Sequence, residues 1–88
     1  MTQNLPGYHI EEIARGETGE ISKLQEELDE LKDAARQGAR VMELIELSDL
    51  IGAIEMYLER HHSQTKLSDL LTMSDITRRA FRNGRRAQ

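Results

Sequence analysis

Two pairs of acidic residues in this chain have the spacing that brings side chains together on a helix. Glu27 and Glu30 form the first pair and Glu46 and Asp49 the second, each three positions apart. Residues with this spacing are neighbours on one helical face. Four converging carboxylates repel one another unless a cation lies between them, and all-oxygen ligands favour Mg²⁺ or Mn²⁺ over zinc. Mg²⁺ held by carboxylates typically binds and polarises a phosphate chain.

The second pair lies in an unusually apolar segment, residues 41–58 (VMELIELSDLIGAIEMYL). Twelve of its eighteen side chains are apolar, and no Lys or Arg lies between Arg40 and Arg60. A helix that is apolar nearly all round is expected to be enclosed. We therefore predict that Glu46 and Asp49 lie inside a bundle or at a subunit interface. Glu43 and Glu55 fall on other sides of the helix and are not assigned to the site.

Apolar residues at helical spacing place these acids on two helices. A stripe centred on Leu24 and Leu28 predicts a first helix over residues 20–37, ended by Gly38, and a second helix follows over 40–62. A short turn at Gly38 makes the two helices antiparallel, so the acidic pairs can face each other. A third helix begins near Leu67, either continuous as far as Asn83 or restarting at Ser74-Asp75.

No alternating strand pattern occurs, so the predicted class is all-α: a helical hairpin plus a third helix, assembling into an oligomer that resembles a four-helix bundle. The sequence divides into an irregular N-terminal arm (1–16), a helical domain (17–84) and a basic tail (85–88). With 88 residues, no Cys and no Trp, the chain is near the lower limit for a core of its own. Oligomerisation is the remaining way to bury more surface.

No window approaches the roughly 20 apolar residues of a membrane span, and the N-terminus lacks the pattern of a secretory signal. We therefore expect a cytoplasmic protein without a membrane partner. The net charge of −4 hides an asymmetry: residues 1–77 have sixteen acids against seven basic residues, whereas residues 78–88 have five Arg and no acid. Such a balance suits a phosphate-bearing ligand held by metal and Arg together, or a nucleic acid contacted by the tail alone.

The acidic motifs resemble those of a known family. Glu27-Leu28-Asp29-Glu30, fifteen intervening residues and Glu46-Leu47-Ser48-Asp49 are similar to the ExxE…ExxD motif of the MazG-like all-α nucleoside triphosphate pyrophosphohydrolases. The similarity covers residues 17–86. It is closest to short phage and bacterial members, with a GExGE sequence before the first helix (residues 16–20) and a basic RAFxxGxR ending (residues 79–86).

The resemblance implies homodimers or homotetramers in the cytosol of a bacterium or of a phage-infected host cell. It implies Mg²⁺, with Mn²⁺ as the alternative, bound by Glu27, Glu30, Glu46 and Asp49. The implied reaction is hydrolysis of a nucleoside triphosphate, or its deoxy form, to the monophosphate and pyrophosphate. Glu26 is the candidate catalytic carboxylate, which would orient the attacking water or a further metal.

Members of this family also hold the phosphates with a Lys, an Asn and an Arg on a later helix. The nearest match here is Arg79, Asn83 and Arg86, although Arg replaces the usual Lys and Gly84 is expected to end the helix before Arg86. The resemblance does not locate the base pocket, to which residues 8–10 (Tyr8, His9 and Ile10) could contribute.

Two other functions stay open from the sequence. The chain could be a catalytically silent all-α oligomer that binds nucleic acid through its Arg-rich C-terminus, but Glu46 and Asp49 would then have no role and nucleic acid is not the favoured partner. It could also be a structural or regulatory bundle that keeps the fold without the activity.

Overall fold

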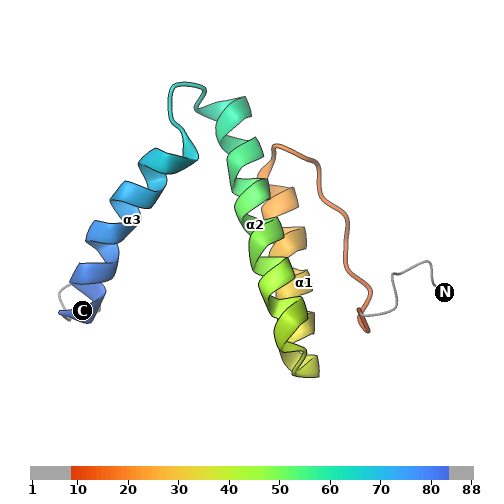
Figure 1. The fold of residues 1–88 in the computed structure, drawn as a ribbon. Coiled ribbons are helices and arrows are strands. Elements are labelled where there is room, and N and C mark those ends of the chain that lie inside the picture. The colour runs from red at the N-terminus through yellow and green to blue at the C-terminus, as the bar shows by residue number, and fades with distance from the viewer. Residues whose placement is uncertain (1–8, 84–88) are drawn as a thin grey trace.

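A computed structural model describes residues 9–83 of the chain, and this region contains three helices and no strand. The helices are α1 (Ile21–Gln37), α2 (Arg40–His61) and α3 (Leu67–Arg82). The all-α class is therefore confirmed. Helix α3 runs unbroken through Ser74 and Asp75, so the third helix is continuous and does not restart there. In Figure 1, α1 and α2 form an antiparallel hairpin and α3 extends away from it.

Gly38 makes the turn between α1 and α2. Its φ of 70° lies in the left-handed region, which only glycine adopts without strain. The amide of Gly38 donates to the carbonyl of Ala35, and the amide of Ala39 donates to the carbonyl of Ala34. These two bonds satisfy carbonyls at the end of α1 and reverse the chain within two residues.

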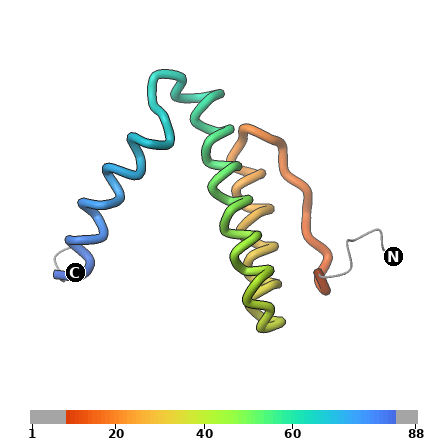
Figure 2. The backbone as a smooth tube through the Cα atoms, in the orientation of Figure 1, coloured from red at the N-terminus to blue at the C-terminus, as the bar shows by residue number. Residues whose placement is uncertain are grey.

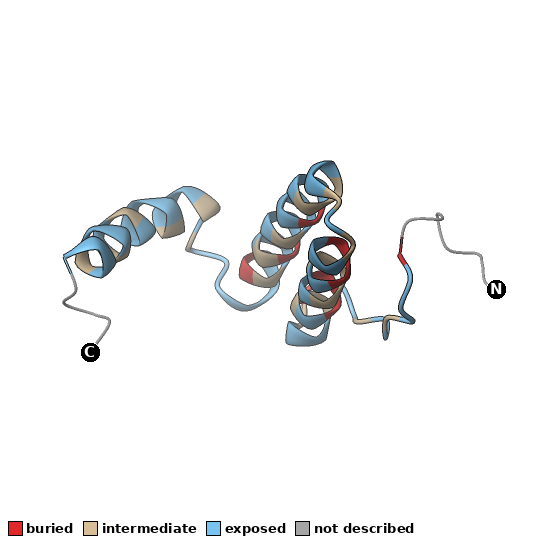
Figure 3. Cartoon of the chain, turned by 90° about the horizontal axis from the view of Figure 1, so that it is seen from below, coloured by how far each residue is buried: buried red, intermediate tan, exposed pale blue. Residues whose placement is uncertain are grey.

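The buried side of the hairpin is formed mainly by small and charged residues. The buried apolar residues among those described are Ala34, Ala53 and Leu58. Figure 3 shows buried positions on the facing sides of α1 and α2 and at the first described residue of the arm. Because alanine has a single methyl group, Ala34 and Ala53 allow the helices to approach each other closely.

Much of the apolar surface of α1 and α2 is exposed to solvent in the single chain. Val41 and Leu44 of α2 are 71% and 67% exposed, and Ile21 and Leu28 of α1 are exposed as well. The hairpin has turned its acidic faces inward, since Glu27 and Glu46 are buried instead. The faces that carry Leu28 and Leu44 are therefore uncovered in the single chain, and of the two predicted settings, inside a bundle or at a subunit interface, the single chain does not provide the first for them.

The arm runs alongside the hairpin (Figure 2). Hydrogen bonds and ion pairs connect it to the hairpin at several points. At one end, the amide of Ile10 donates to Asp33 at 2.9 Å. Further along, the amide of Gly16 donates to Glu26 at 2.8 Å. Near the start of α1, Arg60 of α2 pairs with Glu17 and Glu20. The segment is thus irregular in conformation but fixed in position.

Helix α3 contacts α2 and not α1 within the described region. Its first turn is capped by Asp69, whose carboxylate accepts the amide of Lys66 at 2.8 Å. None of its residues is buried, and Leu71, Ile76 and Phe81 are more than half exposed. No helix in the described part of the chain is both long and apolar enough to span a membrane.

Alanine substitutions at Gly38, in the turn before α2, and at Gly52, within α2, should have opposite effects on stability. Gly38→Ala forces a side chain into the left-handed region and should lower the free energy of unfolding by about 1 kcal/mol. Gly52→Ala, at a helical position where an added methyl meets nothing within 4 Å, should raise it by about 0.5–1 kcal/mol. Urea unfolding followed by circular dichroism measures both. Equal shifts of the same sign would contradict the assigned turn.

Candidate functional site

The structure brings together the four carboxylates of the two acidic pairs. Glu27, Glu30, Glu46 and Asp49 each offer an oxygen, and these four atoms lie within 4.8 Å of one another. The antiparallel hairpin produces this arrangement, because it sets the middle of α1 against the first half of α2. Neither Glu43 nor Glu55 belongs to this carboxylate cluster.

The four carboxylates differ in their access to solvent. Glu46 is 1% exposed and Glu27 is also buried, whereas Glu30 is half-buried. Asp49 is exposed in the single chain, so of its two predicted settings, inside a bundle or at a subunit interface, the single chain does not provide the first. Three positions after Glu46, Asp49 is rotated from it by about 60° around the helix axis, which accounts for its greater exposure. The cluster therefore has a buried end at Glu46 and an open end at Asp49.

Mutual repulsion and burial shift the protonation of the cluster. Burial and the neighbouring carboxylates of Glu27 and Glu46 raise the pKa of Glu30 to about 8. Burial also raises the pKa of Glu46, against the opposing effects of a hydrogen bond with Glu30 and of the nearby His9. Without a cation, Glu30 therefore retains a proton at neutral pH.

Two carboxylate oxygens of the cluster are buried without a hydrogen-bond partner, Oε1 of Glu27 and Oε1 of Glu46. Lys23 pairs with the other oxygen of Glu27 at 3.1 Å. An unpaired carboxylate oxygen out of water costs free energy, and a bound divalent cation removes that cost. The donor set, four carboxylates with two unsatisfied buried oxygens, fits a hard divalent cation.

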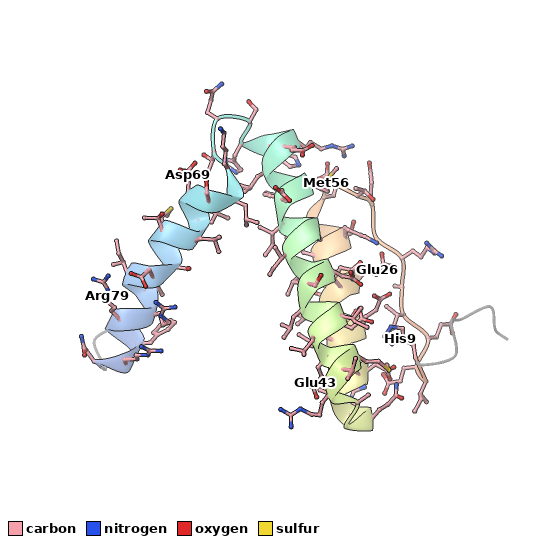
Figure 4. All side chains as sticks on the ribbon, viewed as in Figure 1. His9, Glu26, Glu43, Met56, Asp69 and Arg79 are labelled. Carbon is pink, nitrogen blue, oxygen red and sulfur yellow. The ribbon has the colours of Figure 1, made fainter. Side chains whose placement is uncertain are left out.

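Glu26, the candidate catalytic carboxylate, is buried beside the cluster but is not one of its four members. Its Oε1 accepts the amide of Gly16 at 2.8 Å and the ammonium of Lys23 at 3.2 Å. Figure 4 shows Glu26 near the arm, on the same side of the hairpin as His9. These contacts fix its position, which is what orienting a water molecule requires.

The predicted phosphate-binding residues are not brought to the carboxylates within one chain. Arg79 is exposed on α3, pairs with Asp75 at 2.7 Å and lies away from His9 and Glu26 in Figure 4. Asn83 is the exposed residue that follows α3. Arg86 lies outside the described residues. The helix ends at Arg82, so Arg79 lies in its last turn and Asn83 is the residue that caps it.

The structure adds residues that the acidic motifs did not reveal. His9 lies between Asp33, at 3.0 Å, and Glu46, at 3.1 Å. Lys23 lies one turn before Glu26 and Glu27 and pairs with both. The spacing of Lys23 at i−3 and i−4 could have been read from the sequence. The contact of His9 could not, because 37 positions separate it from Glu46 and no periodic pattern fixes the path of the arm.

Comparison of this chain with protein-family models, curated proteins and solved structures finds no match. The resemblance to MazG-like enzymes therefore depends on the two acidic motifs, residues 27–30 and 46–49, and on the sequences that flank them. The geometry of the carboxylate cluster is an independent observation of this structure.

The shifted pKa of Glu30 predicts a pH dependence of stability in the absence of divalent cations. The folded chain binds this proton more tightly than the unfolded chain, in which the pKa is near 4.5. The resulting stabilisation is complete below pH 4.5 and is lost as the pH rises to about 8. Urea unfolding in chelator should therefore give a falling free energy of unfolding across this range.

Glu30→Gln, which keeps the shape of the side chain but cannot ionise, should flatten this pH dependence. Added Mg²⁺ should stabilise the wild-type protein more at pH 8 than at pH 6, since protons compete with the cation for the same oxygens. A pH dependence that is identical in the wild type and Glu30→Gln would contradict the assignment.

Proposed function

We propose that this chain hydrolyses (deoxy)nucleoside triphosphates to the monophosphate and pyrophosphate in a Mg²⁺-dependent reaction. The observation that supports this most directly is the carboxylate cluster, with four oxygens within 4.8 Å and buried oxygens that have no partner. The resemblance of Glu27-Leu28-Asp29-Glu30 and Glu46-Leu47-Ser48-Asp49 to the ExxE…ExxD motif supports the choice of substrate.

In this proposal the cation is held by Glu27, Glu30, Glu46 and Asp49, and Mn²⁺ can replace Mg²⁺. A divalent cation bound there supplies positive charge that neutralises and orients the triphosphate. The open end of the cluster at Asp49 is the side from which phosphate oxygens can reach it, because Glu46 and Glu27 are enclosed.

Glu26 orients the attacking water in this proposal. The water oxygen forms a new bond to the α-phosphorus, and the bond from that phosphorus to the oxygen bridging towards the β-phosphate breaks. The electron pair leaves with pyrophosphate, and the proton of the water passes to a carboxylate. The proposed phosphate contacts are Arg79, Asn83 and Arg86. Because Arg79 lies on α3, this helix must approach a carboxylate cluster before Arg79 can contact a phosphate bound there.

The activity is tested by assaying pyrophosphate release from a panel of nucleoside triphosphates with Mg²⁺ or Mn²⁺. Glu46→Gln removes a ligand charge while keeping the side-chain volume, and should lower kcat/KM by at least about 100-fold. Glu43→Gln is the matched control, because it makes the same change on the same helix outside the carboxylate cluster. Glu43 pairs with Arg40 at 3.9 Å only, so this substitution should leave the activity unchanged.

No release from any nucleotide, combined with salt-sensitive RNA or DNA binding that is lost when residues 78–88 are deleted, would favour the nucleic-acid-binding alternative. Two of the five Arg in that segment, Arg78 and Arg79, are already paired with Asp75, which makes this outcome less expected. Inactivity in both assays would favour a structural role.

The proposed enzyme is a homodimer or homotetramer. The supporting observation is the uncovered apolar surface of the hairpin, where Val41 and Leu44 are exposed and a groove is lined by Leu24, Leu28 and Ile54. Burying such surface against a second copy contributes about 25 cal/mol per Å². A hairpin with so few buried apolar residues needs this contribution.

Light scattering after size-exclusion chromatography should give the mass of a dimer or tetramer for the wild type. Leu44→Glu places a charge on the uncovered face and should shift the chain to the monomer or prevent folding. Gln64→Glu, at an exposed loop position, adds the same charge outside that face and should not change the mass. A monomeric wild type at about 100 μM, well above typical dissociation constants of stable oligomers, would contradict the proposal.

A further inference from the structure

The imidazole of His9 bridges the arm and the carboxylate cluster. Its Nδ1 lies 3.0 Å from Oδ2 of Asp33 and its Nε2 lies 3.1 Å from Oε2 of Glu46, and the side chain is 5% exposed. A histidine enclosed in this way has a fixed ring orientation. The two nitrogens therefore have separate partners on α1 and α2.

Asp33 determines which ring nitrogen donates. Its Oδ2 also accepts the amide of Ile10 at 2.9 Å and the side-chain amide of Gln37 at 3.0 Å. Two N–H donors therefore already converge on this oxygen, as they do on an ionised carboxylate, which only accepts. Nδ1 of His9, the third nitrogen at the same oxygen, is then the donor in its contact with Asp33. Nε2 is left directed at Glu46.

The position of Nε2 makes His9 a possible ligand as well as a neighbour. His9, Glu30 and Glu46 each offer one atom within 4.8 Å of the others, and two of these residues are shared with the carboxylate cluster. Glu46 is almost completely buried, and its Oε1 has no hydrogen-bond partner. The shared region thus combines a nitrogen donor with unsatisfied carboxylate oxygens.

We propose that Nε2 of His9 ligates a divalent transition-metal ion together with Glu30 and Glu46, with Asp33 holding the ring through Nδ1. This inference rests on the proposed function, because the site is the same. It gives the centre a nitrogen ligand from the arm, which the two acidic motifs do not contain. Imidazole suits transition metals better than it suits Mg²⁺, so the nitrogen ligand should make the centre favour a transition-metal ion such as Mn²⁺ over Mg²⁺.

The arrangement of Asp33 matches the role of an outer partner to a metal-bound histidine. Such histidines donate the hydrogen of the second ring nitrogen to a carboxylate or carbonyl, which fixes the tautomer and the ring plane. Asp33 is a positioning residue in this sense, since it contacts His9 and is not a member of either ligand group. Cation binding would also hold residue 9 of the arm against α1 and α2.

The alternative role for His9 is a counter-charge to Glu46, in which a proton lies between Nε2 and Oε2. The two roles differ in one measurable respect. A ligating imidazole nitrogen couples magnetically to a paramagnetic ion, whereas a histidine that only neutralises Glu46 is not bonded to the ion.

The test uses the full chain with Mn²⁺ and electron spin echo envelope modulation, which detects ¹⁴N bonded to the ion. The wild type should show imidazole nitrogen coupling that changes when histidine is labelled with ¹⁵N. The chain has three histidines, so the double substitution His61→Ala and His62→Ala leaves only His9. Retention of the coupling in this variant assigns it to His9, even if His9→Ala fails to fold.

His9→Ala should abolish the coupling and weaken Mn²⁺ binding by about 10-fold or more, with a smaller effect on Mg²⁺ binding. Asp33→Asn should weaken Mn²⁺ binding while the coupling persists. Bound Mn²⁺ without nitrogen coupling in the wild type would overturn the role of His9, as would coupling lost in the His61/His62 variant.

The outcomes separate this inference from the proposed reaction. Nitrogen coupling without pyrophosphate release from any nucleotide would support the ligand and overturn the reaction. Pyrophosphate release from a protein whose Mn²⁺ shows no nitrogen coupling would do the reverse. A chain that binds neither Mn²⁺ nor Mg²⁺ would overturn both.

Discussion

Ionisable side chains are buried between α1 and α2, and their electrostatic compensation is the constraint on which the other features depend. Glu27 and Glu46 are buried within one cluster, and Asp33 is buried six positions after Glu27 on α1. Removing an unpaired carboxylate from water costs several kcal/mol. The hairpin is stable only if protons, basic residues, amide donors or a cation offset that cost.

The arm supplies a large part of this compensation. The amides of Ile10 and Gly16 donate to Asp33 and Glu26, and His9 lies between Asp33 and Glu46. Close approach explains why residue 16 is a glycine: a Cβ there would lie 2.1 Å from the carbonyl oxygen of Ser22. An irregular segment can present its amides to carboxylates because it does not use them in a helix of its own. The arm is thus part of the site.

The sequence predicted the helices well because their determinants are local. Periodic apolar residues and Gly38 gave bounds close to those of α1 and α2, and the three-residue spacing of each acidic pair, with the tight turn, accounts for the convergence of the four carboxylates. Which face of each helix turns inward was not predictable in the same way. The sequence left open whether the apolar stripes pack inside a bundle or at a subunit interface, because a chain this short can bury them in either way.

The path of the arm depends on contacts distant in sequence. His9 contacts Asp33 and Glu46, which are 24 and 37 positions away in the sequence. A single histidine forms no periodic pattern from which such contacts could be predicted. Lys23 was predictable from its spacing, yet its ability to neutralise two carboxylates at once depends on the burial of both. Local rules therefore locate the ligands on their helices, and tertiary contacts decide which of them are enclosed.

The proposed cation and the proposed assembly act on the same folding equilibrium. Only three apolar residues among those described are fully buried, so burial within one chain provides little stabilisation against a conformational entropy cost of about 1–2 kcal/mol for each ordered residue. A ligand that binds only the folded hairpin stabilises it by mass action, and so does a second copy that covers its apolar faces. Each raises the population of the state that the other binds. Cation binding and oligomerisation are therefore expected to be linked even where no residue takes part in both.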